Sequence, residues 1–110
     1  MRTFEKQSWE TWDYDLEMRD WFNELDDNDY ITSLEVTCEP AFGPSPALTL
    51  GPDLQPDWVI IPDKCGKMRR GKVWIGYGTD QIDYVVTVKV FTFVGRRDEN
   101  EFRIRVRDKP

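Results

Sequence analysis

Apolar and polar residues alternate most clearly in the C-terminal third of the chain. Residues 82–93 form a run of β-branched and aromatic residues without Gly or Pro, and residues 102–107 alternate apolar residues with arginines. Because successive side chains of a strand point to opposite faces, both stretches are predicted to be strands. The polar, glycine-containing segment 95–100 between them indicates a β-hairpin. The residues expected on its buried face are Tyr84, Val86, Val88, Val90, Phe102, Ile104 and Val106.

Shorter strands are predicted upstream, each bounded by turn-forming residues. They cover residues 13–18, 30–38, 57–62 and 71–78. No stretch carries an apolar stripe at helical spacing, and residues 20–25 are expected to form at most one or two helical turns. Short strands separated by turns, with no helices between them, favour an all-β fold, an immunoglobulin-like antiparallel β-sandwich.

The length and the distribution of proline indicate how the chain is organised. Its 110 residues predict one domain spanning residues 1–110. Five of the seven prolines fall between residues 39 and 56. This segment is therefore expected to be a long exposed loop with a short extended piece at 47–50, and loops of this length are often functional or mobile.

The residue inventory argues against catalysis. There is no histidine, so nucleophile systems that need one and histidine-ligated metals are excluded. Cys38 and Cys65 are too few for a four-ligand zinc site. Free buried thiols are favoured over a disulfide between them, which remains the alternative. We expect no catalytic residue and no cofactor.

Charge is distributed unevenly along the chain. Residues 1–63 hold 3 Lys/Arg against 15 Asp/Glu, and residues 64–110 hold 12 against 6, so the two parts carry −12 and +6 of the total −6. Either acidic and basic strands interleave within the fold, or the molecule is polar and meets oppositely charged neighbours. The negative total argues against a nucleic-acid partner. The N-terminus has no apolar run, so no secretion signal and no membrane span are expected.

Two charged segments contain residue types that bind ligands, but neither has the spacing that such a site requires. The acidic run 24–29 contains groups that suit calcium, but the EF-hand spacing fails because glycine is missing at its sixth position. A solvated turn is favoured, and no metal site is expected. The basic segment 64–72 could hold phosphates, but it lacks P-loop spacing. A surface turn or a contact to an acidic neighbour is the preferred interpretation.

Aromatic and arginine side chains are the candidates for binding a partner. Aromatic residues crowd the first 22 positions, and three arginines alternate along 103–107 to form one outward row on the last strand. The aromatic rings could complete the core, form a protein interface or stack on sugars. The residues proposed to contact partners are Trp9, Trp12, Trp21, Arg103, Arg105 and Arg107.

Tyr84 resembles the tyrosine corner of immunoglobulin-like domains. It lies at the start of the long strand, two residues before Val86, which occupies the place of the antibody cysteine. In that feature the tyrosine hydroxyl hydrogen-bonds to the preceding connection. The resemblance is to sandwiches without the disulfide, of the fibronectin or bacterial type.

The order of motifs along the chain is similar to a family of small immunoglobulin-like virion proteins of tailed bacteriophages, the fiber–tail adaptors. The segments that carry the resemblance are Lys6, 12–16, 20–22, 29–31, 73–80, 84–88, 95–99 and 102–108. The proline-rich middle departs from the family pattern.

The resemblance implies a non-enzymatic structural protein of the virion, made in the host cytoplasm. It would attach tail fibres to the tail or head–tail machinery in many symmetric copies, bound to other virion proteins and to no membrane. A capsid decoration protein and a carbohydrate-binding module are the alternatives.

Overall fold

Eight strands build the fold in the computed structural model, which describes residues 1–17, 28–64 and 66–110. The expected helical turns at 20–25 and Trp21 lie outside these residues. The strands are β1 (Arg2–Lys6), β2 (Thr11–Glu17), β3 (Ile31–Glu39), β4 (Leu48–Leu50), β5 (Trp58–Pro62), β6 (Met68–Tyr77), β7 (Asp83–Thr92) and β8 (Arg97–Val106).

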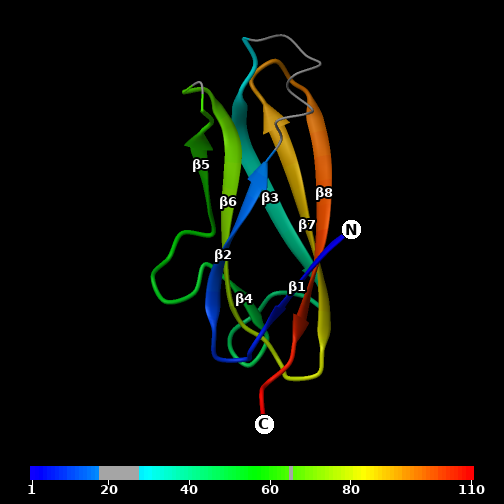
Figure 1. Cartoon of the computed structure of the whole chain (residues 1–110). Helices are drawn as coiled ribbons and strands as arrows, with labels where there is room; N and C mark the ends of the chain where they lie inside the picture. Colours follow the sequence, from blue (N-terminus) through cyan, green and yellow to red (C-terminus); the bar gives the residue numbers. More distant parts are fainter. Residues whose placement is uncertain (18–27, 65) are drawn as a thin grey trace.

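The strands form two sheets that pack face to face, so the all-β sandwich is confirmed (Figure 1). One sheet has the order β1-β8-β7-β3, and the other has β2-β6-β4 with β5 also paired to β6. The units β3-β7-β8 and β2-β6-β5 match the C-F-G and B-E-D strands of an immunoglobulin domain. The long axis of the molecule follows the strands, with extents of 48 × 28 × 23 Å.

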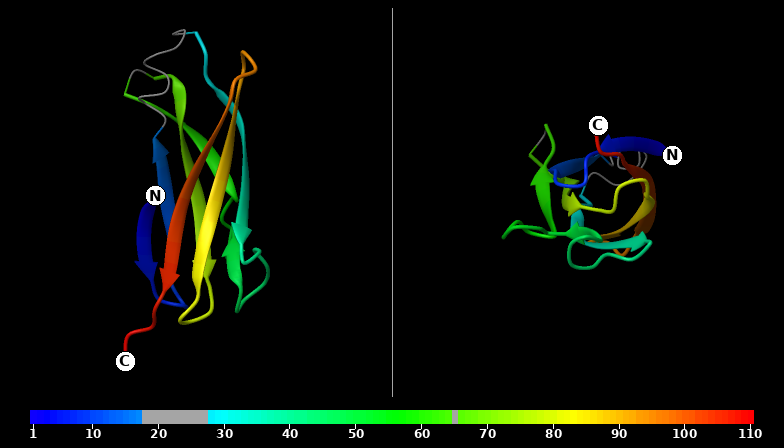
Figure 2. Two further views of the ribbon diagram at one scale, coloured as in Figure 1. Left: turned by 90° about the vertical axis from the view of Figure 1, so that its right-hand side faces the viewer. Right: turned by 90° about the horizontal axis from the view of Figure 1, so that it is seen from below.

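The sandwich has two ends, called the hairpin end and the C-terminal end. The hairpin end carries the β7–β8 turn, the β5–β6 turn and the start of β3 (Figures 1 and 2). The C-terminal end carries the β1–β2 turn, the β6–β7 turn and residues 107–110. Connections at each end therefore come from both sheets.

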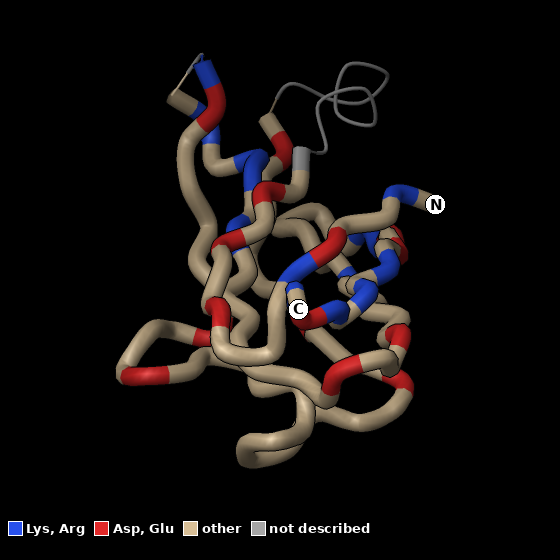
Figure 3. The backbone as a smooth tube through the Cα atoms, turned by 60° about the horizontal axis from the view of Figure 1, so that its bottom comes forward, with Lys and Arg blue, Asp and Glu red and all other residues tan. Residues whose placement is uncertain are grey.

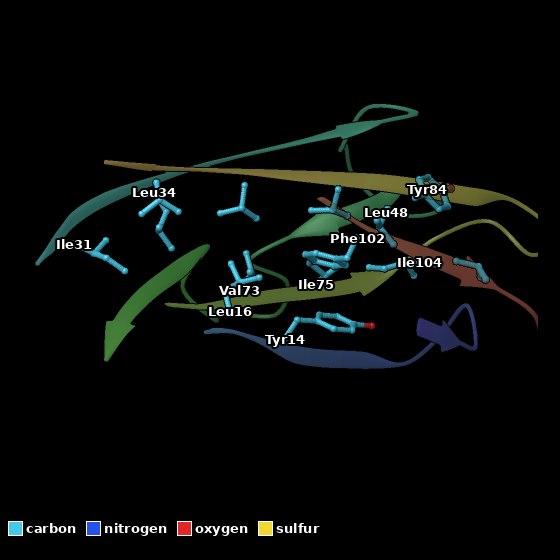
Figure 4. Packing of buried hydrophobic residues seen from close by; sticks show 14 residues of the cluster. Tyr14, Leu16, Ile31, Leu34, Leu48, Val73, Ile75, Tyr84, Phe102 and Ile104 are labelled. Carbon is cyan, nitrogen blue, oxygen red and sulfur yellow. The ribbon is translucent and has the colours of Figure 1, made fainter. Parts of the chain in front are cut away.

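The core lies between the inner faces of the sheets, where alternate residues of each strand meet (Figure 4). All seven residues expected on the buried face of the C-terminal hairpin are buried there. Three aromatic rings close the side of the sandwich where β1 passes. Phe4 lies edge-on to Tyr14 and Phe102, with ring centroids 4.9 and 5.6 Å away. Aromatic pairs prefer this geometry over direct face-to-face stacking.

The strand β1 corrects the expected purely antiparallel arrangement. It runs parallel to β8, with Phe4 beside Ile104, and the sequence analysis predicted no strand there. By pairing with β8, β1 covers the edge of that strand and brings Phe4 into the aromatic cluster. The chain then turns at residues 7–10 into β2 of the opposite sheet. The five residues of β1 alternate too briefly to be recognised as a strand from sequence.

Two predicted turns are shorter than expected because strand pairing extends into them. β8 begins at Arg97, so most of 95–100 belongs to a strand and the turn is confined to residues 93–96. Similarly, β6 begins at Met68, and the second half of the basic segment 64–72 pairs with β5. Charged residues on the outward face of a paired strand make its sequence resemble a polar turn.

The proline-rich segment is partly buried. Its extended piece is confirmed as β4, which pairs with the end of β6. Leu48 is fully buried and Pro52 is buried too, so this segment contributes to the core as well as to the surface. The backbone turns sharply after β4 at Gly51, whose φ is 63°, a conformation that glycine adopts without strain.

Val88→Ala tests the core. Val88 is fully buried between Val36 of β3 and Asn100 of β8, so its truncation is expected to lower the free energy of unfolding by roughly 1–3 kcal/mol. Chemical denaturation measures this loss. The matched control is Lys89→Ala at the next, exposed position of the same strand, which is expected to change stability by less than about 0.5 kcal/mol. An unchanged stability of Val88→Ala would contradict the register of β7.

Candidate functional site

The tryptophans proposed as partner-binding residues are strongly exposed where they are described. Trp9 in the β1–β2 turn is 72% exposed, and Trp12 at the start of β2 is 51% exposed. Trp12 lines a shallow hollow with Arg2 and Glu5 of β1. Exposed aromatic rings are the compositional mark of interface centres, so both residues stay candidates at the C-terminal end.

The arginine row of β8 divides into three different environments. Arg107 is half-buried and donates to Asp83 of β7 at 2.7 Å. Arg105 is exposed and lies 3.8 Å from the same carboxylate. Arg103 is exposed next to Thr3 of β1 and makes no ion pair with the described residues. Arg103 is therefore the most available guanidinium of the row, and Arg107 is largely used within the fold.

A buried lysine organises the C-terminal end. The Lys6 side chain is 2% exposed, and its Nζ donates to the carbonyl oxygens of Gln7 and Tyr77. Tyr77 ends β6 with a left-handed φ of 60°. One ammonium thus links the β1–β2 turn to the last residue of β6, across the two sheets.

Burial changes the proton affinity of this lysine. Desolvation lowers the pKa of Lys6 from 10.5 to about 8, although the carboxylates of Glu10 and Asp108 act in the opposite direction. A buried ammonium is tolerated only where it is hydrogen-bonded, and the two carbonyl acceptors meet that requirement here.

The rest of this end is held by side-chain contacts to the backbone. Asp108 accepts from the N–H and the hydroxyl of Ser8, at 2.7 and 2.8 Å, and its own N–H donates to Asp80 at 2.8 Å. The Tyr84 hydroxyl accepts the N–H of Thr79 in the β6–β7 connection at 3.1 Å. The contact predicted for a tyrosine corner is therefore confirmed.

A buried carboxylate organises the opposite, hairpin end. Asp29, two residues before β3, is 1% exposed. Its Oδ1 accepts the N–H groups of Tyr30 at 2.9 Å and Val94 at 3.0 Å, and its Oδ2 lies 3.2 Å from Arg96. Arg69 donates from Nε to the Asp29 carbonyl oxygen. One residue thus connects β3 and β6 with the β7–β8 turn.

The surrounding donors keep this carboxyl group ionised. Burial alone raises the pKa of Asp29, but hydrogen bonds from Val94, Thr92 and Tyr30 and the charge of Arg96 outweigh it, so the net pKa is lowered. Asp29 therefore stabilises the folded chain above the unfolded pKa of about 4, and this contribution is lost as the pH falls through the lower folded pKa.

Asp29 also corrects the expectation of a solvated turn at the end of the acidic run 24–29. Positions 24–27 lie outside the described residues, while Asp29 is buried and engaged by protein donors. Among the described residues, no group of three or more acidic or cysteine side chains could hold a metal ion. Sequence reasoning missed this role because the partners Val94 and Arg96 lie 65 and 67 positions away.

The turn held by Asp29 exposes apolar side chains. Phe93 is 66% exposed and Val94 54% exposed, and the Phe93 ring stacks on exposed Tyr30 with centroids 5.1 Å apart. Tyr30, Phe93 and Val94 are called the hairpin tip below. A hollow lined partly by Tyr30, Lys67 and Met68 lies beside it.

The fold brings some oppositely charged segments of the chain side by side (Figure 3). Acidic β2 pairs with basic β6, where Lys72 lies 2.9 Å from Asp13 and Arg70 lies 3.6 Å from Asp15. The Asp29–Arg96 pair also joins the two charged halves. Interleaving therefore accounts for part of the charge, and exposed pairs of this kind contribute about 0–1 kcal/mol each.

Two smaller expectations concern cysteine and membranes. Cys38 carries a free, half-buried thiol whose pKa is raised to about 12 by desolvation, and Cys65 lies outside the described residues. Across the part of the chain described, no helix is long and apolar enough to cross a membrane.

Most of the chain matches one known protein family. The family described as podophage GP4 fiber-tail adaptor protein gp77 matches residues 6–105, which is nearly the whole chain. No curated protein matches the chain. Several segments on which the sequence resemblance rested meet in space, since Asp29 contacts Arg96 at one end and Lys6 contacts Tyr77 at the other. The chain belongs to the podophage fiber–tail adaptor family and is a structural adaptor of the virion.

Lys6→Met tests the buried ammonium. Between the folded pKa of about 8 and the unfolded value of 10.5, the unfolded chain binds more protons at this position than the folded chain. The penalty for burying the charge is therefore fully present at pH 7 and is relieved as the pH rises through 8. We expect the stability of the natural chain relative to Lys6→Met to increase between pH 7 and pH 10.

Urea denaturation at several pH values measures this difference, and comparison within the pair cancels contributions that both chains share. Lys89→Met, at an exposed lysine, is the matched control. The expectation fails if the stability difference between the natural chain and Lys6→Met stays constant over this range.

Proposed function

We propose that this chain is a non-enzymatic part of the virion that joins tail fibres to the tail or head–tail machinery. The match of residues 6–105 to the adaptor family is the observation that carries this proposal. An adaptor needs two separate contact surfaces, and the sandwich offers two distant ends along its 48 Å axis. Each end is held by its own buried ion, Lys6 or Asp29.

The C-terminal end supplies one of these surfaces in this proposal. Trp9 and Trp12 provide exposed aromatic area there. Arg103 and Arg105 lie on the neighbouring outer face of β8, with Thr3 and Glu5 of β1 beside them. Rigid aromatic side chains with arginine at their border are typical of interface hot spots, and guanidinium groups form forked contacts with carboxylates.

Several symmetric copies are part of the proposal. Fibres are attached around the tail of a virion, so the adaptor occupies equivalent positions, and a repeated contact closes into a ring when its rotation permits. The protein is made in the host cytoplasm and reaches its place when particles assemble.

Removing the chain tests the function directly. Particles assembled without it are expected to lack fibres while retaining their genome-filled heads, because the link between fibre and tail is missing. Quantitative mass spectrometry and electron microscopy of purified particles measure the fibre content, and supplying the natural chain from a plasmid should restore it. Particles that keep their fibres without the chain would show that it has another role.

Charge reversal at two arginines tests the proposed interface. Arg103→Glu with Arg105→Glu is expected to reduce incorporation of the chain into particles, because both guanidiniums would meet carboxylates of a partner. Lys89→Glu, on the outer face of the same sheet, is the control. Melting temperatures verify that the variants fold. Normal incorporation of the folded double variant would exclude an interface role for this pair.

A further inference from the structure

We propose that the hairpin tip, formed by Tyr30, Phe93 and Val94, docks into an apolar pocket on a second virion protein, distinct from the partner bound at the C-terminal end. This inference rests on the adaptor function proposed above. It assigns to the far end of the sandwich the second contact that an adaptor requires.

The residues of the tip are unusual for their position. Turns are commonly built from Gly, Asn, Asp, Ser and Pro, because these residues adopt or stabilise turn conformations. The β7–β8 turn instead begins with Phe93 and Val94, and only Gly95, with a φ of 96°, has the backbone conformation that calls for glycine. Both apolar side chains remain more than half exposed, so the core gains little from them.

The backbone beneath these side chains is fixed by hydrogen bonds. The Phe93 N–H donates to the Tyr30 carbonyl at 3.0 Å, and the Val94 N–H donates to the buried Asp29 carboxylate. Thr92 accepts the Arg96 N–H on its hydroxyl oxygen at 3.0 Å. Each residue of the turn is therefore anchored to the fold.

The aromatic stack restricts the side chains in the same way. The Tyr30 and Phe93 rings are nearly parallel, with an interplanar angle of 12°. A surface whose groups are already ordered loses less conformational entropy on binding, so more of the contact energy appears as affinity. Exposed and pre-ordered aromatic area is the usual composition of an interface hot spot.

The shape and surroundings of the tip define its partner. The turn projects at the end of the molecule (Figures 1 and 2), so a matching surface has to be concave and apolar. Exposed Arg97 begins β8 next to the turn, which favours carboxylates at the border of that pocket. A second protein of the particle fits this description, because the family function requires two partners and the other end offers the aromatic and arginine surface for the first.

The test replaces the apolar side chains and analyses assembled particles. Phe93→Ser with Val94→Asp is introduced into the full chain and supplied during infection in place of the natural chain. Because both side chains are exposed, the variant is expected to fold with a melting temperature close to the natural one. The matched control is Leu54→Asp, which alters a fully exposed leucine in the β4–β5 connection.

Mass spectrometry of purified particles measures the adaptor and the fibres relative to the major capsid protein. Loss of fibres by at least tenfold with the adaptor retained supports the proposal and assigns the tip to the fibre. Loss of the adaptor itself by a similar factor supports it and assigns the tip to the tail. The control should retain both proteins.

Adaptor and fibre contents equal to those of the natural chain would overturn the tip as a docking site. The adaptor function is judged separately by particles assembled without the chain. If those particles keep their fibres, the proposed function fails, whatever the result for the tip. If they lose them while the tip variant behaves normally, only the tip is excluded.

Discussion

The buried carboxylate of Asp29 is the constraint on which the hairpin end depends. A carboxylate taken out of water is strongly unfavourable unless donors surround it, and here two backbone N–H groups and the Arg96 guanidinium do so. These donors come from Tyr30, the residue before β3, and from the β7–β8 turn. Leaving a buried acceptor without one of its donors costs about 1–3 kcal/mol, and more when the acceptor is charged. The carboxylate therefore fixes where the turn lies relative to the start of β3. Arg69 of the opposite sheet donates to the backbone carbonyl oxygen of the same residue.

The C-terminal end follows the same principle with the opposite charge. Lys6 donates to backbone carbonyls where Asp29 accepts from backbone N–H groups. The Lys6 ammonium joins connections of both sheets, whereas the Asp29 carboxylate joins the residue before β3 to the β7–β8 turn of the same sheet. The apolar core supplies the cohesion between the sheets, but it does not determine the conformation of turns beyond its limits. The two buried ions hold the backbone of these turns, so the side chains of Trp9 and Phe93 can stay exposed on an ordered backbone.

The sequence predicts the parts of this fold that repeat along the chain and misses those that depend on distant pairs. The alternation in β7 and β8 identifies seven buried residues, since period-two patterning reflects burial on one face. The parallel strand β1 is too short to show such a pattern, and the outward charges of β6 and β8 resemble turns. Asp29 and Lys6 look like ordinary surface ions, because the groups that bury them lie far away in the chain. Among the candidate contact residues, the exposed tryptophans stand out in the sequence by residue type, whereas Phe93 ends a run predicted to be a strand.

In the proposed docking, a rigid tip and multiple copies would together offset the small area of each contact. A typical stable interface buries about 800 Å² on each partner, more than three side chains at a turn provide. Hot-spot energetics reduce the requirement, since a few fully desolvated aromatic residues carry most of the binding energy. The proposed repetition around a symmetric particle would reduce it further, because each additional contact forms at a high effective concentration once the first has formed. Pre-ordering by Asp29 matters most under these conditions, since every copy would otherwise lose the same conformational entropy on docking.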